Sequence, residues 1–162
     1  APFSAFTLLS QDPPTILFQA VEGEREKDTA RNIRLSGEFV VNIPNLPLIE
    51  QMHLCSASLP PEQSEVERFG IATAPSLCVK PPRIAAAPIC FECKLIMFFP
   101  IGREPHVVFI GEVKHFYVRD DLYDDGRIDQ ALLQPICRIG GPWYARLGEM
   151  IHMPAADGLV KS

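Results

Sequence analysis

The sequence lacks any apolar stretch long enough to cross a membrane as a helix. Its most apolar run, Ile89 to Phe99, is interrupted by Glu92 and Lys94. Basic residues are also in the minority, since 15 Lys and Arg stand against 20 Asp and Glu and the net charge is −5. This balance is the opposite of the basic surface that nucleic-acid-binding proteins carry. We therefore expect a protein that acts on neither a membrane nor a nucleic acid.

A disulfide framework is not expected, because the five cysteines are an odd number. Free cysteines are typical of reducing compartments, so we expect a cytoplasmic location. At 162 residues the chain suits one domain, residues 1–162. It opens at Ala1-Pro2-Phe3-Ser4, which reads as the middle of a motif, so we expect the first N-terminal strand of the fold to be missing from this numbering.

Motifs for metals and dinucleotides are incomplete or missing. Cys90 and Cys93 form a C-x-x-C, but apolar residues alternate around them as in a strand, where residues three apart point to opposite faces. No second cysteine pair or nearby histidine pair completes a zinc site. The acidic run 120–126 does not match an EF-hand, and no G-x-G-x-x-G follows a strand. We therefore expect that both cysteines are structural, that the acidic run is a turn, and that the protein has no metal site. A nicotinamide nucleotide is expected to bind transiently at most.

Sixteen prolines and ten glycines divide the chain into short elements. Apolar patterns predict strands over 15–21, 38–43, 89–99 and 106–119. They predict helices over 28–36, 48–55, 64–69 and 129–133. The helix over 64–69 is expected to begin with a capping box formed by Ser64 and Glu67. Each of the last two strands is longer than about 30 Å, and strands of this length in a small domain curl into a barrel. We expect a mainly β protein, a closed or nearly closed barrel with a few short helical caps.

The start of the helix over 28–36 has the composition of a phosphate site. The first N–H groups of a helix have no intrahelical partners, and the helix dipole makes that end partly positive. Lys27 adds a cation there and Thr29 a hydroxyl, while Asp28 is expected to cap the helix. The alternative interpretation is an ordinary capped surface helix without a ligand.

Several segments, taken in order, carry a family resemblance. They are Ala1-Pro2-Phe3-Ser4-Ala5-Phe6, Ser10-Gln11-Asp12-Pro13-Pro14, Lys27-Asp28-Thr29-x-x-Asn32-Ile33, Gly37-Glu38-Phe39-Val40-Val41-Asn42, Val79-Lys80-Pro81-Pro82-Arg83, Gly111-Glu112-Val113 and Arg138-x-Gly140-Gly141-x-x-Tyr144-Ala145-Arg146. With them the chain resembles, over nearly its whole length, the flavin reductase-like family of FMN-binding split barrels, which includes the flavoredoxins. The resemblance implies a Greek-key split β-barrel, non-covalently bound FMN and a homodimer.

The resemblance also implies which residues hold the FMN. The phosphate would be bound by Lys27, Thr29 and Asn32 with Asp28 beside them, and the ring and ribityl chain by Ser4, Ala5, Phe6 and Ser10. Lys80 would bring a positive charge to the pyrimidine edge, and Tyr144 would cover the ring. From the residues alone, the first segment also fits a plain barrel strand, Lys80 a solvated loop lysine, and the aromatic pair at Tyr144 a packing anchor.

His106 is the candidate catalytic residue. Related flavin reductases carry a Gly-Asp-His segment here, whose histidine has been proposed to face the nicotinamide. This chain reads Arg103-Glu104-Pro105-His106 instead, so a plain strand-end histidine is the alternative. We expect an FMN-dependent oxidoreductase that accepts hydride from NADH or NADPH and either keeps its reduced flavin or passes it to a monooxygenase partner. The alternatives are a flavoredoxin-like electron carrier that serves a protein partner without efficient NAD(P)H oxidation, and a split barrel that has lost its cofactor.

Overall fold

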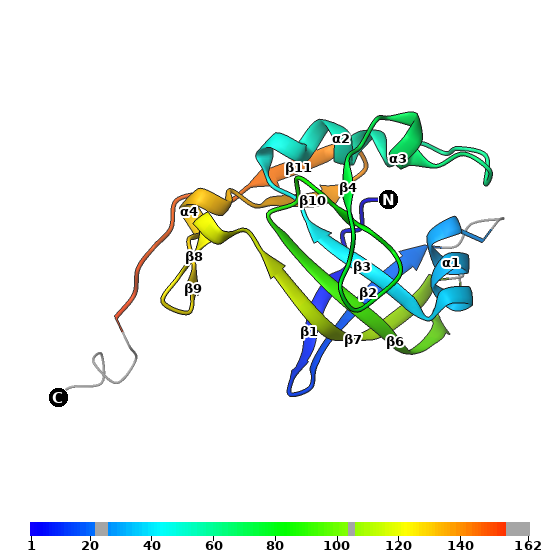
Figure 1. The fold of residues 1–162 in the computed structure, drawn as a ribbon, viewed down its shortest axis with the longest axis horizontal. Coiled ribbons are helices and arrows are strands. Elements are labelled where there is room, and N and C mark those ends of the chain that lie inside the picture. The colour runs from blue at the N-terminus through cyan, green and yellow to red at the C-terminus, as the bar shows by residue number, and fades with distance from the viewer. Residues whose placement is uncertain (22–25, 104–105, 155–162) are drawn as a thin grey trace.

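The computed structural model describes residues 1–21, 26–103 and 106–154. Within this part of the chain, five strands form one antiparallel sheet in the order β1-β2-β7-β6-β3. They are β1 (Phe6–Gln11), β2 (Pro14–Val21), β3 (Glu38–Ile43), β6 (Ile89–Ile101) and β7 (His106–Val118). The sheet curls on itself, as Figure 1 shows. Four of these strands are the predicted ones, and the expectation of a mainly β protein is confirmed.

The curl originates in the long hairpin of β6 and β7. The two strands pair along their whole length, from Ile89 opposite Val118 to Ile101 opposite His106. The register of the pair shifts between Glu92 and Cys93, and again between Leu95 and Met97. A bulge bends its strand and increases the local twist, so a hairpin with two of them curves toward a barrel.

The main core lies on one face of this sheet. The Phe18 ring of β2 lies 5.3 Å from the Phe109 ring of β7 and 5.4 Å from the Phe39 ring of β3. Gly111 gives Phe39 its space, because a Cβ atom at Gly111 would lie only 2.5 Å from Phe39 Cζ. Glycine is the residue that permits such a close approach.

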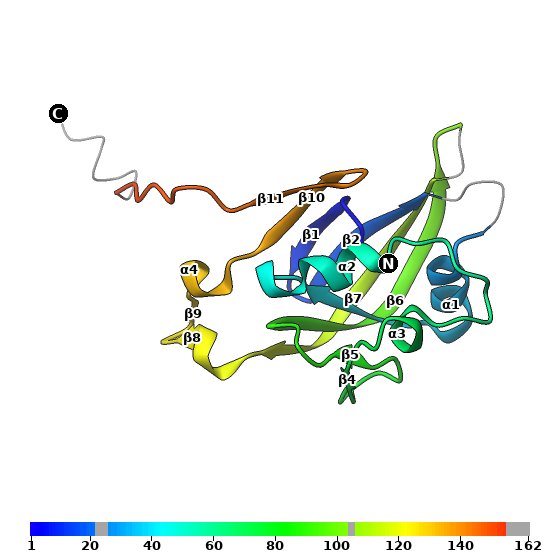
Figure 2. The ribbon, with the colours of Figure 1, turned by 90° about the horizontal axis from the view of Figure 1, so that it is seen from above.

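Helix α1 (Asp28–Ser36) covers one end of the sheet. Its apolar residues Ala30 and Ile33 are buried in the same core cluster. The helix ends as predicted at Gly37, which has a left-handed φ of 68° and donates its N–H to Ile33 O at 2.8 Å. Figures 1 and 2 both show α1 at the end of the sheet where β6 gives way to β7.

Two predicted helix caps are wrong. Lys27, not Asp28, is the N-cap residue of α1, and Asp28 is already helical, with its carboxylate 3.5 Å from Arg31 Nη2 one turn on. Pairs of opposite charge three residues apart are neighbours on a helix surface, which gives the carboxylate a partner other than the helix end. The capping box at α3 (Glu65–Arg68) also fails: Ser64 makes no side-chain capping bond, and only its carbonyl accepts the Arg68 N–H, at 2.9 Å.

The remaining elements are short. They are η1 (Leu46–Leu48), α2 (Ile49–Leu54), β4 (Thr73–Ala74), β5 (Arg83–Ile84), η2 (Asp120–Leu122), β8 (Tyr123–Asp124), β9 (Arg127–Ile128), α4 (Gln130–Leu133), β10 (Ile136–Gly140) and β11 (Trp143–Arg146). The acidic run 120–126 forms η2, then β8 and the turn of the β8–β9 hairpin, where Asp125 and Gly126 both have positive φ. Asp129 caps α4 by accepting the Leu132 N–H at 2.9 Å. The expected acidic turn and the helix after it are therefore both present.

The two cysteines of the C-x-x-C lie in different clusters. Cys90 packs with Leu48 and Ala87, whereas Cys93 belongs to the main core. Burial raises the pKa of Cys90 to about 11 and that of Cys93 to about 12. Thiols that stay protonated are poor nucleophiles and poor metal ligands. The predicted divergence of the two side chains is confirmed, and both act as packing residues.

The described helices are all short, and α1, with nine residues, is the longest of them. None of these helices is long and apolar enough to cross a membrane. After β11, residues 147–154 run away from the sheet without regular structure (Figure 2).

Candidate functional site

The first turn of α1 presents the donors that the sequence predicted. Lys27 occupies the N-cap and makes no side-chain capping bond, so the first-turn N–H groups lack the acceptor that a Ser, Thr, Asp or Asn cap supplies. The lysine side chain is exposed, Thr29 is half-buried, and Asn32 follows one turn later. A cation, a hydroxyl and an amide beside a helix N-terminus form a donor set that suits a phosphate.

An open pocket of about 490 Å³ runs alongside α1. Its lining combines the helix residues Thr29, Asn32, Ile33, Leu35 and Ser36 with Glu38, Phe39 and Val40 of β3 and with Pro81 and Pro82. Two of the predicted phosphate ligands therefore face the proline pair that follows Lys80. The volume falls within the range of about 300–1,000 Å³ that is usual for small-molecule sites.

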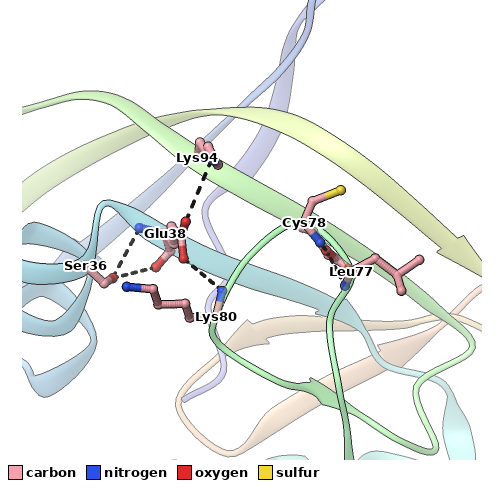
Figure 3. A network of polar contacts seen from close by, with 7 residues as sticks. Ser36, Glu38, Leu77, Cys78, Lys80 and Lys94 are labelled. Carbon is pink, nitrogen blue, oxygen red and sulfur yellow. Dashed lines mark hydrogen bonds and ion pairs between the residues drawn. The ribbon is translucent and has the colours of Figure 1, made fainter.

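Lys80 directly precedes the two prolines that line this pocket. The backbone N–H of Lys80 donates to Glu38 Oε2 at 2.8 Å, and Lys94 Nζ lies 3.9 Å from Glu38 Oε1. Figure 3 shows the Lys80 side chain extending in the direction of Ser36, at the last turn of α1. The negative charge of the Glu38 carboxylate disfavours an anion at this end of the pocket, although its contacts with the Lys80 N–H and with Lys94 Nζ offset part of that charge. An anion is therefore favoured at the Thr29 end.

The N-terminal segment is held by three contacts. The Phe3 ring packs edge-on against Phe18 at 5.1 Å. Ser4 Oγ accepts a hydrogen bond from Arg138 Nη1 at 2.8 Å, and the Ala5 carbonyl accepts one from the Gln19 N–H at 3.1 Å. Two of the small residues predicted to line a flavin are thus fixed between β2 and β10.

His106 lies at the end of the sheet where α1 begins. It stands opposite Val21, the last residue of β2, and its Nδ1 contacts the side-chain amide of Gln19. Since Gln19 also bonds to Ala5, the candidate catalytic residue and the N-terminal segment share a neighbour. Glu104 and Pro105, which replace the expected Gly-Asp pair, lie outside the described residues.

Tyr144 belongs to the β10–β11 hairpin. Its hydroxyl lies 2.9 Å from His53 Nδ1 of α2, and the two rings meet edge-on. On the opposite strand its register partner is Arg138, which donates to Ser4. Arg138 Nε is buried and has no hydrogen-bond partner among the described residues. The hairpin therefore links α2 to the N-terminal segment and brings Tyr144 into the same region as Ser4.

One predicted flavin ligand, Ser10, lies apart from this group. Ser10 donates to the Asp12 carbonyl at 3.3 Å in the β1–β2 turn and stands opposite Thr15. From Thr15 to Val21 the strand advances about 20 Å, so Ser10 is not brought to α1. Phe6, which follows Ala5 at the start of β1, is 39% exposed, and its ring lies 6.3 Å from the Phe91 ring of β6.

Sequence reasoning missed two further side-chain acceptors, one on β6 and one on β3. Glu92 accepts the N–H groups of Leu77 and Cys78, and Asn42 Oδ1 accepts the Ile84 N–H. Together with Glu38 they hold the segment that carries Lys80. The sequence feature that could have indicated this role is Glu92 itself, because it is an acidic residue at a buried position of an otherwise apolar strand.

The donor set fits the group that the resemblance implies. A flavin mononucleotide needs donors for its phosphate, backbone groups that can come close to the polar edge of its ring, and a pocket beside them. The first turn of α1, the fixed segment at Ser4 and Ala5, and the pocket beside Thr29 match these needs.

Comparison with known proteins gives a consistent result. The family model described as flavin reductase-like domain matches residues 1–132. An uncharacterized protein from Halalkalibacterium halodurans is 42% identical over 160 residues, covering 94% of this chain and 76% of that protein. The crystal structure of nitrilotriacetate monooxygenase component B from Bacillus cereus is 34% identical, with a TM-score of 0.90 over 94% of this chain and 78% of that one.

Two structures with lower sequence identity share the fold of this chain. A protein with a split barrel domain from Shewanella frigidimarina is 23% identical, with a TM-score of 0.83 over 95% of this chain and 77% of that one. A flavoredoxin of Desulfovibrio vulgaris is 22% identical, with a TM-score of 0.78 over 96% of this chain and 82% of that one. The expected split-barrel fold is confirmed. By its family match and its relatives, the chain belongs to the flavin reductase-like family.

Proposed function

We propose that this protein is an FMN-dependent oxidoreductase that accepts hydride from NADH or NADPH. The observation that carries the proposal is the first turn of α1, where Lys27 and Thr29 flank a helix start without a side-chain cap, next to a pocket of about 490 Å³. The similarity to a monooxygenase component from Bacillus cereus supports redox chemistry. FMN, when bound, supplies the hydride acceptor.

The protein's own part is binding and orientation. Lys27 neutralises phosphate charge, and Thr29 and Asn32 donate to phosphate oxygens, with Asp28 at the same turn. Ser4 and Ala5 are small, so their backbone can approach the polar edge of the ring, and their bonds to Arg138 and Gln19 keep them in place. We further propose that Lys80 supplies positive charge near the pyrimidine edge, with Tyr144 over the ring and Phe6 beside it.

His106 is proposed to face the nicotinamide. Its contact with Gln19 orients the imidazole at the end of the sheet that also holds Lys27. Hydride transfer needs alignment of donor and acceptor more than it needs proton transfer, so the expected role of His106 is positioning of the nicotinamide.

Anaerobic reduction tests this activity. Protein loaded with FMN is mixed with NADH and, separately, NADPH while the flavin absorbance is followed. We expect rapid bleaching with at least one nucleotide, and a rate about tenfold lower in His106→Ala. Dithionite reduction and FMN affinity should stay unchanged in that variant, and His115→Ala on the same strand serves as the control. Bleaching by dithionite alone would overturn the reductase proposal.

The second candidate is a flavoredoxin-like carrier that exchanges electrons with a protein partner. The departure from Gly-Asp-His before His106 favours it, because that segment is where a nicotinamide site is expected. A reductase could instead deliver reduced flavin to a monooxygenase. The anaerobic experiment separates the carrier from the reductase, since only the reductase is bleached by a nicotinamide nucleotide. In both cases the five free cysteines agree with a cytoplasmic location.

A homodimer is proposed through the sheet face opposite the main core. Cross-strand rows place nine side chains on that face: Leu17, Ile110 and Met97, then Gln19, Val108 and Phe99, then Val21, His106 and Ile101. Seven of these side chains are apolar, and Met97, Ile101 and Val21 are each more than half exposed. Exposed apolar faces of this kind mark protein interfaces, and two-fold dimers are the commonest oligomers.

A further inference from the structure

Three side chains from the sheet accept hydrogen bonds from the backbone of the segment from Leu77 to Ile84. Glu92 of β6 accepts from Leu77 and Cys78, Glu38 of β3 accepts from Lys80, and Asn42 of β3 accepts from Ile84. We call Glu38, Asn42 and Glu92 the acceptor clamp. Figure 3 shows the segment arching over β3 and β6, with the backbone amide of Lys80 directed at the Glu38 carboxylate.

Glu92 is the strongest member of the acceptor clamp. It is 1% exposed. Its Oε1 and Oε2 lie 2.9 and 3.0 Å from Leu77 N, and Oε2 lies 2.6 Å from Cys78 N. A buried carboxylate is costly to keep in a protein interior unless donors satisfy it, and here two backbone N–H groups do so.

The clamped segment forms one wall of the pocket beside α1. Pro81 and Pro82 line that pocket opposite Thr29 and Asn32, and Lys80 precedes them. The proline rings restrict the backbone on one side of Lys80, and the bond to Glu38 fixes its amide. The position of the Lys80 side chain relative to α1 therefore depends on the acceptor clamp.

We propose that Glu92 is a positioning residue for the cofactor, acting through the segment that carries Lys80. The inference rests on the proposed binding of FMN in the pocket beside α1. A wall that is already ordered loses little freedom when the ligand binds, so the acceptor clamp favours binding by preorganisation. Glutamate is required because a carboxylate only accepts. In Glu92→Gln the amide NH₂ would face a backbone N–H, and at least one bond would be lost.

The structural half of the proposal is tested without cofactor. Amide hydrogen exchange is measured by NMR on the wild-type protein, on Glu92→Gln, and on Glu62→Gln as a control with an exposed carboxylate outside the acceptor clamp. The Leu77 and Cys78 amides should exchange at least about tenfold faster in Glu92→Gln, with β2 and β7 amides unchanged. Unchanged exchange at Leu77 and Cys78 would overturn the acceptor clamp.

The functional half is tested with a double-mutant cycle. Dissociation constants for FMN are measured for the wild type, Glu92→Gln, Lys80→Ala and the double variant, well below the unfolding temperature. We expect Glu92→Gln to weaken FMN binding about tenfold, and to have less than about a twofold effect in the Lys80→Ala background. General destabilisation would not produce this dependence on Lys80.

The outcomes separate this inference from the proposed function. If the wild type does not bind FMN, the proposed function fails, and the inference fails with it. If the wild type binds FMN but Glu92→Gln binds equally well, or loses the same factor with and without Lys80, the proposed function stands and the positioning role of Glu92 is overturned.

Discussion

The ring of Phe39 rests directly on the backbone of Gly111. A Cβ atom at position 111 would lie 2.5 Å from Phe39 Cζ and 2.7 Å from Cε1, closer than atoms can approach without displacement. Phe39 itself packs against Phe18 in the main core. This contact ties β3 to β7 across β6 and closes the curl of the sheet, which in turn fixes where α1 stands.

The Gly111→Ala variant should therefore be destabilised. Overpacking a well-filled core costs about 1–3 kcal/mol in the free energy of unfolding, and here the neighbour is a ring held by other rings. Urea unfolding followed by circular dichroism measures the change. Gly148→Ala is the control, because a Cβ atom there meets nothing within 4 Å. Equal stability of the two variants would show that the Phe39 ring moves aside freely.

The five thiols should differ sharply in reactivity. Cys78 and Cys137 are exposed, whereas Cys90 and Cys93 are buried and burial raises the pKa of each. A colorimetric thiol reagent at neutral pH should label the exposed pair in the native protein and the buried pair only after unfolding. Mass spectrometry of the labelled peptides identifies the sites. Fast native labelling of Cys93 would contradict the described core.

The same thiols make stability depend on alkaline pH. In the unfolded chain they ionise near their ordinary pKa of 9.0, but in the folded protein the pKa is about 11 for Cys90 and about 12 for Cys93. The unfolded state therefore loses protons first, and their contribution to stability is lost as the pH rises from 9 toward these values. The free energy of unfolding should fall less steeply over this range in Cys90→Ala/Cys93→Ala than in the wild type.

The proposed dimer has a direct test in solution. The wild type should sediment as a dimer at micromolar concentration, and Met97→Lys should shift it toward the monomer, because the substitution buries a charge in an apolar interface. Leu54→Lys, at an exposed position on α2 that is not one of the nine side chains of that face, should leave the dimer intact. A wild type that sediments as a monomer would contradict the dimer.

Much of the fold could be predicted because its signals are local. The alternating strands of the long hairpin, the helix start after Lys27 and the stop at Gly37 all follow from residue patterns within a few positions. Two caps were predicted wrongly: the Asp28 carboxylate has another partner, Arg31, once the helix is in place, and Ser64 makes no side-chain capping bond. Which partner a short polar side chain takes depends on competing local contacts that the pattern does not contain.

The candidate site was harder to predict because its parts are far apart in the sequence. Thr29 and Asn32 meet Pro81 and Pro82 across the pocket, and Ser4 meets Arg138 from the far end of the chain. The role of Glu92 depends on the backbone of a segment whose path only the fold determines. Ser10 lies close to Ser4 in the sequence, but the extended strand places it at the opposite end of β2 from α1.

The most direct test of the phosphate seat at α1 is equilibrium binding of FMN to the wild type and to Lys27→Ala/Thr29→Ala, with riboflavin as a ligand that lacks the phosphate. Each lost charge-assisted bond costs about 1.5–3 kcal/mol, so FMN affinity should fall at least about 100-fold in the double variant, while riboflavin affinity changes little. Lys114→Ala/Thr73→Ala, which removes the same residue types elsewhere, should bind FMN like the wild type. Unchanged FMN affinity in Lys27→Ala/Thr29→Ala would contradict the phosphate seat at α1.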